Sequence, residues 1–177
     1  MIKLGFKDED LGWNDVVRDL DRISRAGLDV GVFDEAAHQP RGTPITLIAA
    51  VNEYGSDAAG IPARPVFART FVRNERKYTS ALRDAIKESV GRGSADIKGE
   101  LQSIGDSMAE DIKRAMHDFS TPANAPATIR KKGEDNPWIH TEQTVEAVEA
   151  RVRDTGLKLT KDKLGRVRMR DSRGRFA

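Results

Sequence analysis

The segment IKGELQSIGDSMAEDIKRAMHDF, residues 97–119, decides the fold class of this chain. Its apolar residues recur at three- or four-residue spacing, which places them on one side of a long helix. They are Ile97, Leu101, Ile104, Met108, Ile112 and Phe119. The preceding segment, from residue 65 or 67 to residue 90, has a similar one-sided pattern and predicts a second long helix. Residues 91–94 (GRGS) follow that helix rather than a strand, so we interpret them as a linker and not as a phosphate-binding loop.

The chain before the two long helices predicts shorter elements. An amphipathic helix that ends at Gly27 is indicated by Trp13, Val16, Val17, Leu20 and Ile23. Residues 28–33 (LDVGVF) predict a strand, and residues 46–54 predict a two-turn helix that ends at a glycine. Residues 1–7 alternate as in a short strand, and residues 34–44, with two prolines and a glycine, predict a loop. We expect the apolar helix stripes to form the core or to be shared with neighbouring copies of the chain.

The chain after the long helices predicts a loop and then strands. Residues 121–138 contain three prolines and one glycine and predict an extended loop. Residues 144–154 fit a strand, although their pattern also allows a helix, and residues 157–160 and 166–170 predict two strands around a turn. The sum is an α+β fold. In it an antiparallel or mixed sheet of N-terminal and C-terminal strands carries the two long central helices on one face.

The length and composition indicate one domain with a modest core. The 177 residues are 38% hydrophobic and 33% charged, and they include no cysteine. This composition excludes a disulfide, a thiolate nucleophile and a cysteine-based zinc site. No apolar run reaches the roughly 18 to 20 residues of a membrane span, so we expect a soluble protein made inside the cell. We divide it into a single α+β domain over residues 1–156, with extended loops at residues 34–44 and 121–138, and a basic hairpin with a tail over residues 157–177.

The common catalytic motifs do not occur in the sequence. It has no phosphate-binding loop, no dinucleotide-binding glycine pattern, no HExxH and no GxSxG. His140 could hold a proton, but a loop histidine bonded to the backbone is the favoured interpretation. The acidic triplet Asp8-Glu9-Asp10 could bind a cation, but we favour a solvated turn with charges at the start of the next helix. We therefore expect no enzymatic activity, no cofactor and no metal.

The net charge of +2 is unevenly distributed along the chain. Residues 158–177 carry eight basic and two acidic residues, a net charge of +6, which leaves −4 for the remainder. Arg166, Arg168 and Arg170 alternate, so a strand would project all three from one face. With Arg173 and Arg175 they could contact successive phosphates of DNA without reading its sequence, or an acidic neighbour. The other interpretation is an exposed strand whose charges prevent edge-to-edge pairing.

Two segments carry a more specific pattern than composition. The first comprises AAVNEYG at residues 49–55 and IPARPVF at residues 61–67. The second comprises APATIR at residues 125–130, KG at residues 132–133 and PWIHT at residues 137–141. In this order, separated by two helices, they resemble the head–tail joining and tail-completion proteins of tailed bacteriophages, which are also described as neck or virion-morphogenesis proteins. The resemblance covers about residues 28–152.

The resemblance implies a structural virion protein rather than an enzyme. Its subunits would form a six-fold or twelve-fold ring that joins the head connector to the tail around the DNA path. The ring would contact portal-side proteins above and tail-tube or terminator proteins below. The protein would assemble in the cytoplasm of the bacterial host and reside in the neck or tail region of the virion, without contact to a membrane. The alternative is a non-specific DNA-binding accessory protein that acts through the C-terminal arginine row.

The motif residues suit structural parts of such a subunit. Asn52 and Glu53 would end a helix, and Gly55 could adopt the positive φ of a helix C-cap. Pro65 would stand near the first position of the next helix. Arg64, held between two prolines, could bind a carboxylate in its own domain or across a subunit boundary. We assign Arg64 to the subunit interface, together with Asn52 and Glu53.

Overall fold

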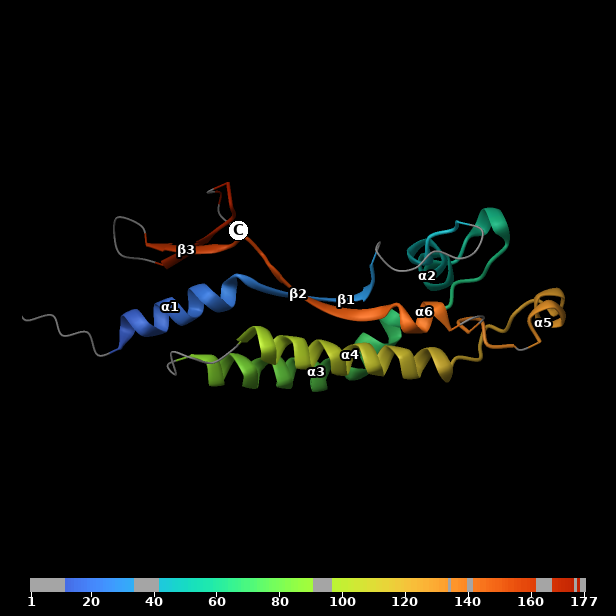
Figure 1. The fold of residues 1–177 in the computed structure, drawn as a ribbon, viewed down its shortest axis with the longest axis horizontal. Coiled ribbons are helices and arrows are strands. Elements are labelled where there is room, and N and C mark those ends of the chain that lie inside the picture. The colour runs from blue at the N-terminus through green and yellow to red at the C-terminus, as the bar shows by residue number, and fades with distance from the viewer. Residues whose placement is uncertain are drawn as a thin grey trace, which may run out of the picture.

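The computed structural model describes residues 12–33, 42–90, 97–133, 135–139, 142–161, 167–173 and 175. This part of the chain has the α+β fold predicted from the sequence, with its elements laid along one long axis (Figure 1). In chain order the elements are α1 (Trp13–Ser24), β1 (Ala26–Val32), α2 (Ile45–Tyr54), the 3-10 helix η1 (Asp57–Ala59), α3 (Phe67–Ser89), α4 (Ile97–His117), α5 (Pro126–Lys132), α6 (Gln143–Glu146), β2 (Val148–Asp154), β3 (Lys158–Lys161) and β4 (Val167–Arg170). The predicted strand at residues 1–7, the acidic triplet, the GRGS linker, His140 and most of the predicted loop at residues 34–44 lie outside the described residues.

The first sheet joins two strands from opposite ends of the sequence. β1 and β2 are antiparallel, and their register runs from Ala26 opposite Asp154 to Val32 opposite Val148. Both strands are predicted from the sequence, although β2 begins only after the short helix α6. Val148 and Ala150 alternate on one face of β2 and are both buried, as the period of a strand requires.

The expectation of one continuous sheet is wrong, because the C-terminal hairpin forms a sheet of its own. β3 pairs with β4, from Lys158 opposite Arg170, and not with β1 or β2. Gly156, at a φ of 68°, lies in the turn that leads away from β2. β3 then packs on α1, where the Leu159 N–H donates to a carboxylate oxygen of Asp21 at 2.9 Å. The predicted basic hairpin is therefore present, but a helix rather than the first sheet supports it.

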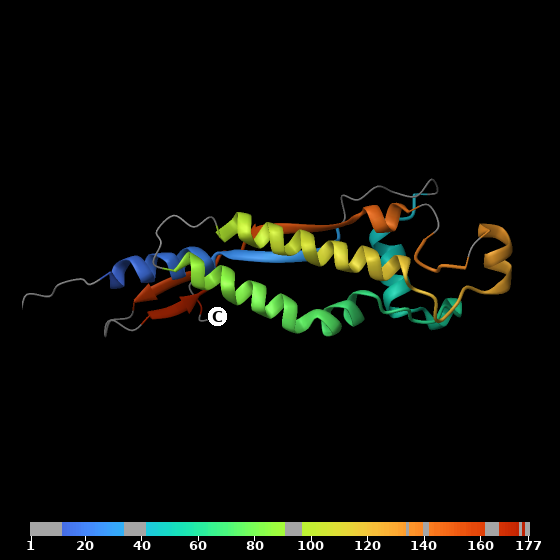
Figure 2. The same cartoon turned by 90° about the horizontal axis from the view of Figure 1, so that it is seen from below.

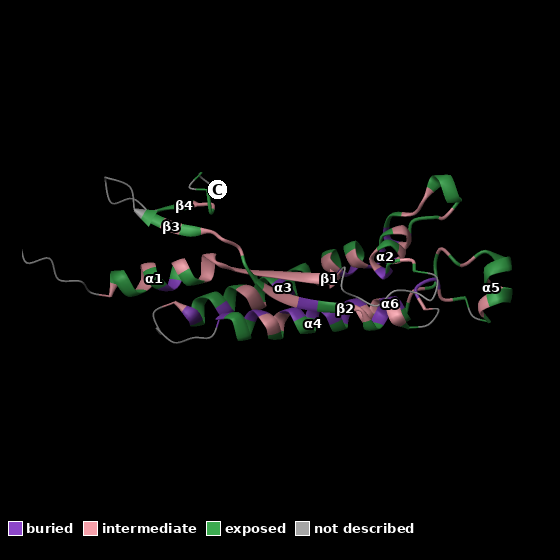
Figure 3. Cartoon of the chain, turned by 45° about the horizontal axis from the view of Figure 1, so that its top comes forward, coloured by how far each residue is buried: buried purple, intermediate pink, exposed green. Residues whose placement is uncertain are grey.

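The two long helices lie on the same side of the first sheet (Figures 1 and 2). α4 packs directly against both strands, and α3 lies beside α4. Gly105 permits this close approach, because a Cβ there would lie 2.6 Å from side-chain atoms of Leu28 and Ala150. The buried residues follow the long helices and β2 (Figure 3), and Ile112 and Met116 of α4 are fully buried at the centre of the main core cluster.

Two local expectations are wrong. Gly27 does not cap α1; it belongs to β1, where strand pairing sets its conformation. The apolar stripe of α1 is partly open, since Trp13 is 61% exposed, and its sharing with a neighbouring copy stays a prediction. Residues 121–138 are not a continuous loop, because they contain α5. That helix begins at Pro126, whose fixed φ suits a first helical position, and ends at Gly133 with a φ of 84°.

Candidate functional site

Glu53, at the end of α2, holds the start of α3. Its buried carboxylate accepts hydrogen bonds from the N–H groups of Val66, Phe67 and Ala68 at 2.7, 3.0 and 2.9 Å. The first turn of a helix leaves such donors unpaired, and the negative charge also faces the positive end of the helix dipole. The cap is thus supplied by another helix rather than by the residue before α3. Pro65, expected near the first helical position, instead precedes the N-cap residue Val66.

The backbone of the first motif segment fixes the connection between α2 and α3. Gly55 ends α2 with a φ of 78°, as predicted. A Cβ at this position would lie 2.7 Å from the Ala63 nitrogen, so only glycine fits the close approach. The Asn52 carbonyl accepts the Arg64 N–H at 2.7 Å. These contacts fold the loop back onto the end of α2 and place Arg64 at the base of α3.

Arg64 ties this connection to the chain that follows α4. Its side chain is 6% exposed, and Nε and Nη2 donate to the carbonyl oxygens of Pro122 and Ala123 at 3.1 and 3.0 Å. Burial lowers the pKa of Arg64, and the charge of Asp135 partly offsets this effect. The prediction that Arg64 binds a carboxylate is therefore wrong for these two hydrogen bonds, because main-chain carbonyl oxygens accept them. The assignment of the three motif residues to a subunit interface stays a prediction.

The second motif segment packs against the first. Nδ2 of Asn136 donates to the carbonyl oxygens of Met116 and His117, both at 2.9 Å, and so caps the end of α4. Oδ1 of Asn136 accepts the Trp138 N–H at 2.9 Å. Trp138 is buried, and its ring meets that of Phe67 edge-on with 5.9 Å between centroids. The two segments therefore form one unit around the start of α3 and the end of α4.

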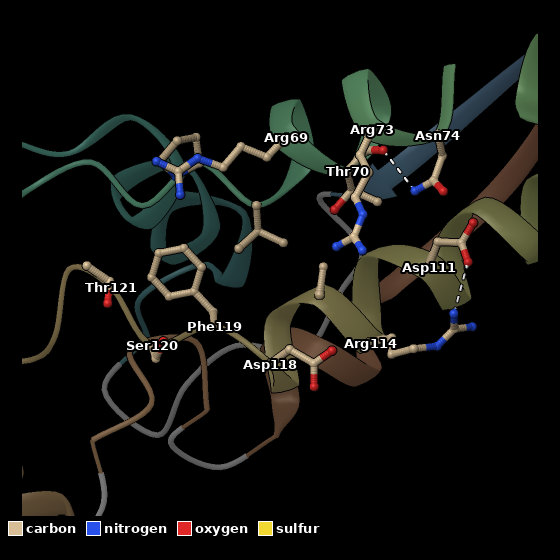
Figure 4. Close-up of a pocket in the computed structure, with 13 residues that line it drawn as sticks. Arg69, Thr70, Arg73, Asn74, Asp111, Arg114, Asp118, Phe119, Ser120 and Thr121 are labelled. Atoms are coloured by element: carbon tan, nitrogen blue, oxygen red, sulfur yellow. Dashed lines mark hydrogen bonds and ion pairs between the residues drawn. The ribbon is translucent and has the colours of Figure 1, made fainter. Parts of the chain in front are cut away.

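A cleft of about 500 Å³ opens beside this unit, between α3 and α4 (Figure 4). Arg69 and Arg73 of α3 line one wall, and Arg114 of α4 lines the other. Val66 and Phe119 contribute apolar surface to the same cleft. Within the described residues, neither Arg69 nor Arg73 has a hydrogen-bond or ion-pair partner. The cleft therefore offers two cationic side chains next to apolar surface.

Asp111 lies in the cleft, where its neighbours neutralise its charge. Nζ of Lys77 and Oη of Tyr78 donate to one carboxylate oxygen at 2.5 and 3.0 Å, and Nη1 of Arg114 lies 3.4 Å from the other. Burial acts to raise the pKa of Asp111, but these hydrogen bonds and the charges of Lys77 and Arg114 outweigh it and leave the pKa lowered. Burial, followed by the hydrogen bond to Asp111, raises the pKa of Tyr78. The ionised Asp111 is thus compensated locally and does not engage Arg69 or Arg73.

The C-terminal arginine row lies only partly within the described residues. Arg168 and Arg170 alternate in β4 and therefore stand on one face of the strand, and both interact with other residues of the chain. Arg173 is exposed, and Arg175 is paired with a carboxylate at 3.0 Å. Arg166 lies outside the described residues. Contact of this row with DNA or with an acidic neighbour stays a prediction.

Within the described ranges, no group of three His, Asp or Glu side chains could hold a metal ion. The helices in the same ranges include none that is long and apolar enough to cross a membrane. Compared with protein-family models, with curated proteins and with solved structures, the chain has no match. A function must therefore be inferred from the surfaces of the chain itself and from the two motif segments.

The cleft arginines are absent from the functional residues predicted from the sequence. Arg69 and Arg73 stand on the polar side of an amphipathic helix, where charged side chains are ordinarily solvated. Their spacing of four residues is the one signal that the sequence contains, because it places both on the same face of α3. The opposite wall cannot be recognised from the sequence, since it depends on how α4 packs beside α3.

Proposed function

We propose that this chain is a structural virion protein, a neck or tail-completion subunit that forms a ring between the head connector and the tail around the DNA path. The observation that carries the proposal is a pair of exposed apolar stripes at opposite ends of an elongated subunit (Figure 1). On α1, Trp13 and Leu20 are 61% and 38% exposed. On α2, Leu47 and Tyr54 are 53% and 81% exposed. Each pair is seven residues apart, so both members stand on one side of their helix.

Unlike surfaces at opposite ends suit a head-to-tail contact between copies. Such a heterologous contact generates a ring when the rotation between neighbours closes. Exposed apolar patches on a chain of this size are also typical of protein–protein contact. The first motif segment supports the same proposal, because Glu53 and Arg64 are used inside the subunit whereas Tyr54 is left on its surface. The motif thus combines a rigid connection with an exposed aromatic ring.

A second candidate function is non-specific DNA binding by an accessory protein. It is favoured by the net charge of +6 over residues 158–177 and by the exposed side chains of Arg168 and Arg173. In a ring the same residues would face DNA in the channel or an acidic neighbour. The two functions therefore differ in whether the chain must assemble into a ring before it contacts DNA.

Light scattering after size exclusion, at low and high salt, distinguishes the two functions. A neck subunit gives a mass that is six or twelve times that of the 19.6 kDa chain, and Leu47→Ser with Tyr54→Ser reduces it. A DNA-binding accessory protein stays small and binds duplex DNA with an affinity that falls steeply as salt rises. As the matched control, Arg168→Gln with Arg170→Gln should weaken DNA binding and leave the mass unchanged. The neck function would be contradicted if the unmodified chain stays small at both salt concentrations and its DNA binding is lost in the Arg168→Gln, Arg170→Gln variant.

A further inference from the structure

We propose that the cleft between α3 and α4 is the docking site for residues 8–13 (DEDLGW) of a second copy of the chain, here called the acidic segment. The inference rests on the proposed ring, and it names the contact that would join neighbouring subunits. Carboxylates of the acidic segment would bind the cleft arginines, and the apolar residues that follow them would cover the apolar surface beside them.

The cleft provides the charges that a run of carboxylates requires. Arg69 and Arg73 are one helical turn apart, and among the described residues neither has an ion-pair partner. In Figure 4, Arg73 extends from α3 toward α4, opposite Arg114 and Asp118. Arginine is suited to this contact because its planar fork of N–H donors matches a carboxylate. In the acidic segment, residues 8–10 supply three consecutive carboxylates.

The apolar surface of the cleft favours a peptide over a nucleic acid or a polyphosphate. Val66 and Phe119 line the cleft, and a volume of about 500 Å³ admits several side chains. The acidic segment ends in Trp13, which is 61% exposed in the single chain. The acidic segment places Leu11 and Trp13 after its carboxylates and so supplies both charge and apolar surface, whereas a phosphate backbone supplies charge alone.

The acidic segment must come from another copy, because its own chain cannot bring it to the cleft. α1 extends beyond one end of the long helices, whereas the cleft lies between the start of α3 and the end of α4, toward the other end (Figures 1 and 2). α4 has 21 residues and is therefore about 30 Å long. The five residues before Trp13 span at most about 18 Å when fully extended. A contact between the two ends therefore joins different subunits head to tail.

Charge reversal on each side of the contact tests the proposal in the full-length chain. The cleft variant is Arg69→Glu with Arg73→Glu, and the segment variant is Asp8→Lys with Glu9→Lys and Asp10→Lys. Light scattering should show that each variant alone loses the large species. Combining all five substitutions in one chain should restore it. The matched control is Arg76→Glu, because Arg76 is exposed on α3 outside the cleft and its reversal should leave the mass unchanged.

Mixing the two variants gives a sharper result. The normal acidic segment of the cleft variant fits the normal cleft of the segment variant, and the reversed segment fits the reversed cleft. The mixture should therefore regain the large species, with the two variants alternating around it, although each variant alone stays small. A ring that forms unchanged from the cleft variant would overturn the cleft contact while leaving the proposed ring in place.

Peptide binding separates the cleft from the ring if the unmodified chain stays monomeric. The probe is a fluorescein-labelled peptide of residues 8–20, titrated with the full-length chain and followed by anisotropy. We expect saturable binding that weakens at least tenfold with the cleft variant and less than twofold with Arg76→Glu. Absence of binding, or equal binding to the cleft variant, would overturn the proposal. A monomer that still binds the peptide through the cleft would overturn the ring alone.

Discussion

Replacing Glu53 by alanine should destabilise the chain more than its position at a helix end suggests. The substitution leaves the N–H of the buried Val66 without an acceptor, which costs about 2 kcal/mol. The partly buried N–H groups of Phe67 and Ala68 also lose their charged acceptor, although water replaces it in part. The start of α3 loses a negative charge that interacts favourably with the helix dipole. These two losses together cost about 1 kcal/mol. We expect the free energy of unfolding to fall by about 3 kcal/mol.

Urea unfolding followed by circular dichroism measures this change at one fixed protein concentration. Glu53→Gln keeps a neutral acceptor oxygen and should lose about half as much stability as Glu53→Ala. Glu75→Ala is the matched control, because Glu75 is exposed on α3, and it should change the free energy of unfolding by less than about 0.5 kcal/mol. A loss below about 1 kcal/mol for Glu53→Ala, or equal losses for Glu53 and Glu75, would refute the capping role.

Three further predictions concern the packing of the long helices, the loop after α4 and the cleft. Gly105→Ala should lower the free energy of unfolding by about 1 to 2 kcal/mol, because the added Cβ would collide with side chains of the first sheet. Gly99 is exposed in the same helix, so Gly99→Ala should instead raise the free energy of unfolding by up to about 1 kcal/mol. Urea unfolding of both variants measures the two changes. Arg64→Met removes two donors to the loop carbonyls and should cost about 2 kcal/mol in the same assay, with faster proteolysis of that loop as a second readout. Because the pKa of Asp111 is lowered in the folded chain, its contribution to stability is present above the unfolded value of about 3.9 and is lost as the pH falls through the folded value. In Asp111→Asn the free energy of unfolding should therefore fall less steeply below about pH 4 than in the unmodified chain. An equally steep fall in both chains would contradict the hydrogen bonds and ion pairs assigned to Asp111.

The sequence predicts the parts of the fold that have a strong local signal. The one-sided apolar spacing of residues 97–119 and the breakers on either side locate α4 to within two residues. The β3–β4 hairpin is found for a similar reason, since two short strands flank a turn. The partner of β1 is not determined locally, because β2 lies more than 110 residues further along the chain. Predicting one sheet in place of two follows from this lack of long-range information.

The candidate site depends still more on tertiary structure. The sequence marks Glu53 as a residue at a helix end, but only the fold shows that it caps the next helix. It likewise places Arg64 in a rigid loop without showing that its partners are carbonyl groups nearly 60 residues away. Arg69 and Arg73 resemble an ordinary solvated helix face until α4 is placed beside them. The sequence pattern alone therefore fails to identify side chains whose role depends on a different helix or loop.

Electron microscopy of the full-length chain in negative stain tests the central claim most directly. The head-to-tail contact between unlike ends predicts closed particles whose class averages show one rotational symmetry, with a central opening wide enough for duplex DNA. The cleft variant, imaged at the same concentration, should show only small particles. Micrographs of the unmodified chain that show only monomers or symmetric dimers would contradict the account, because neither species joins the two different ends of the subunit into a ring.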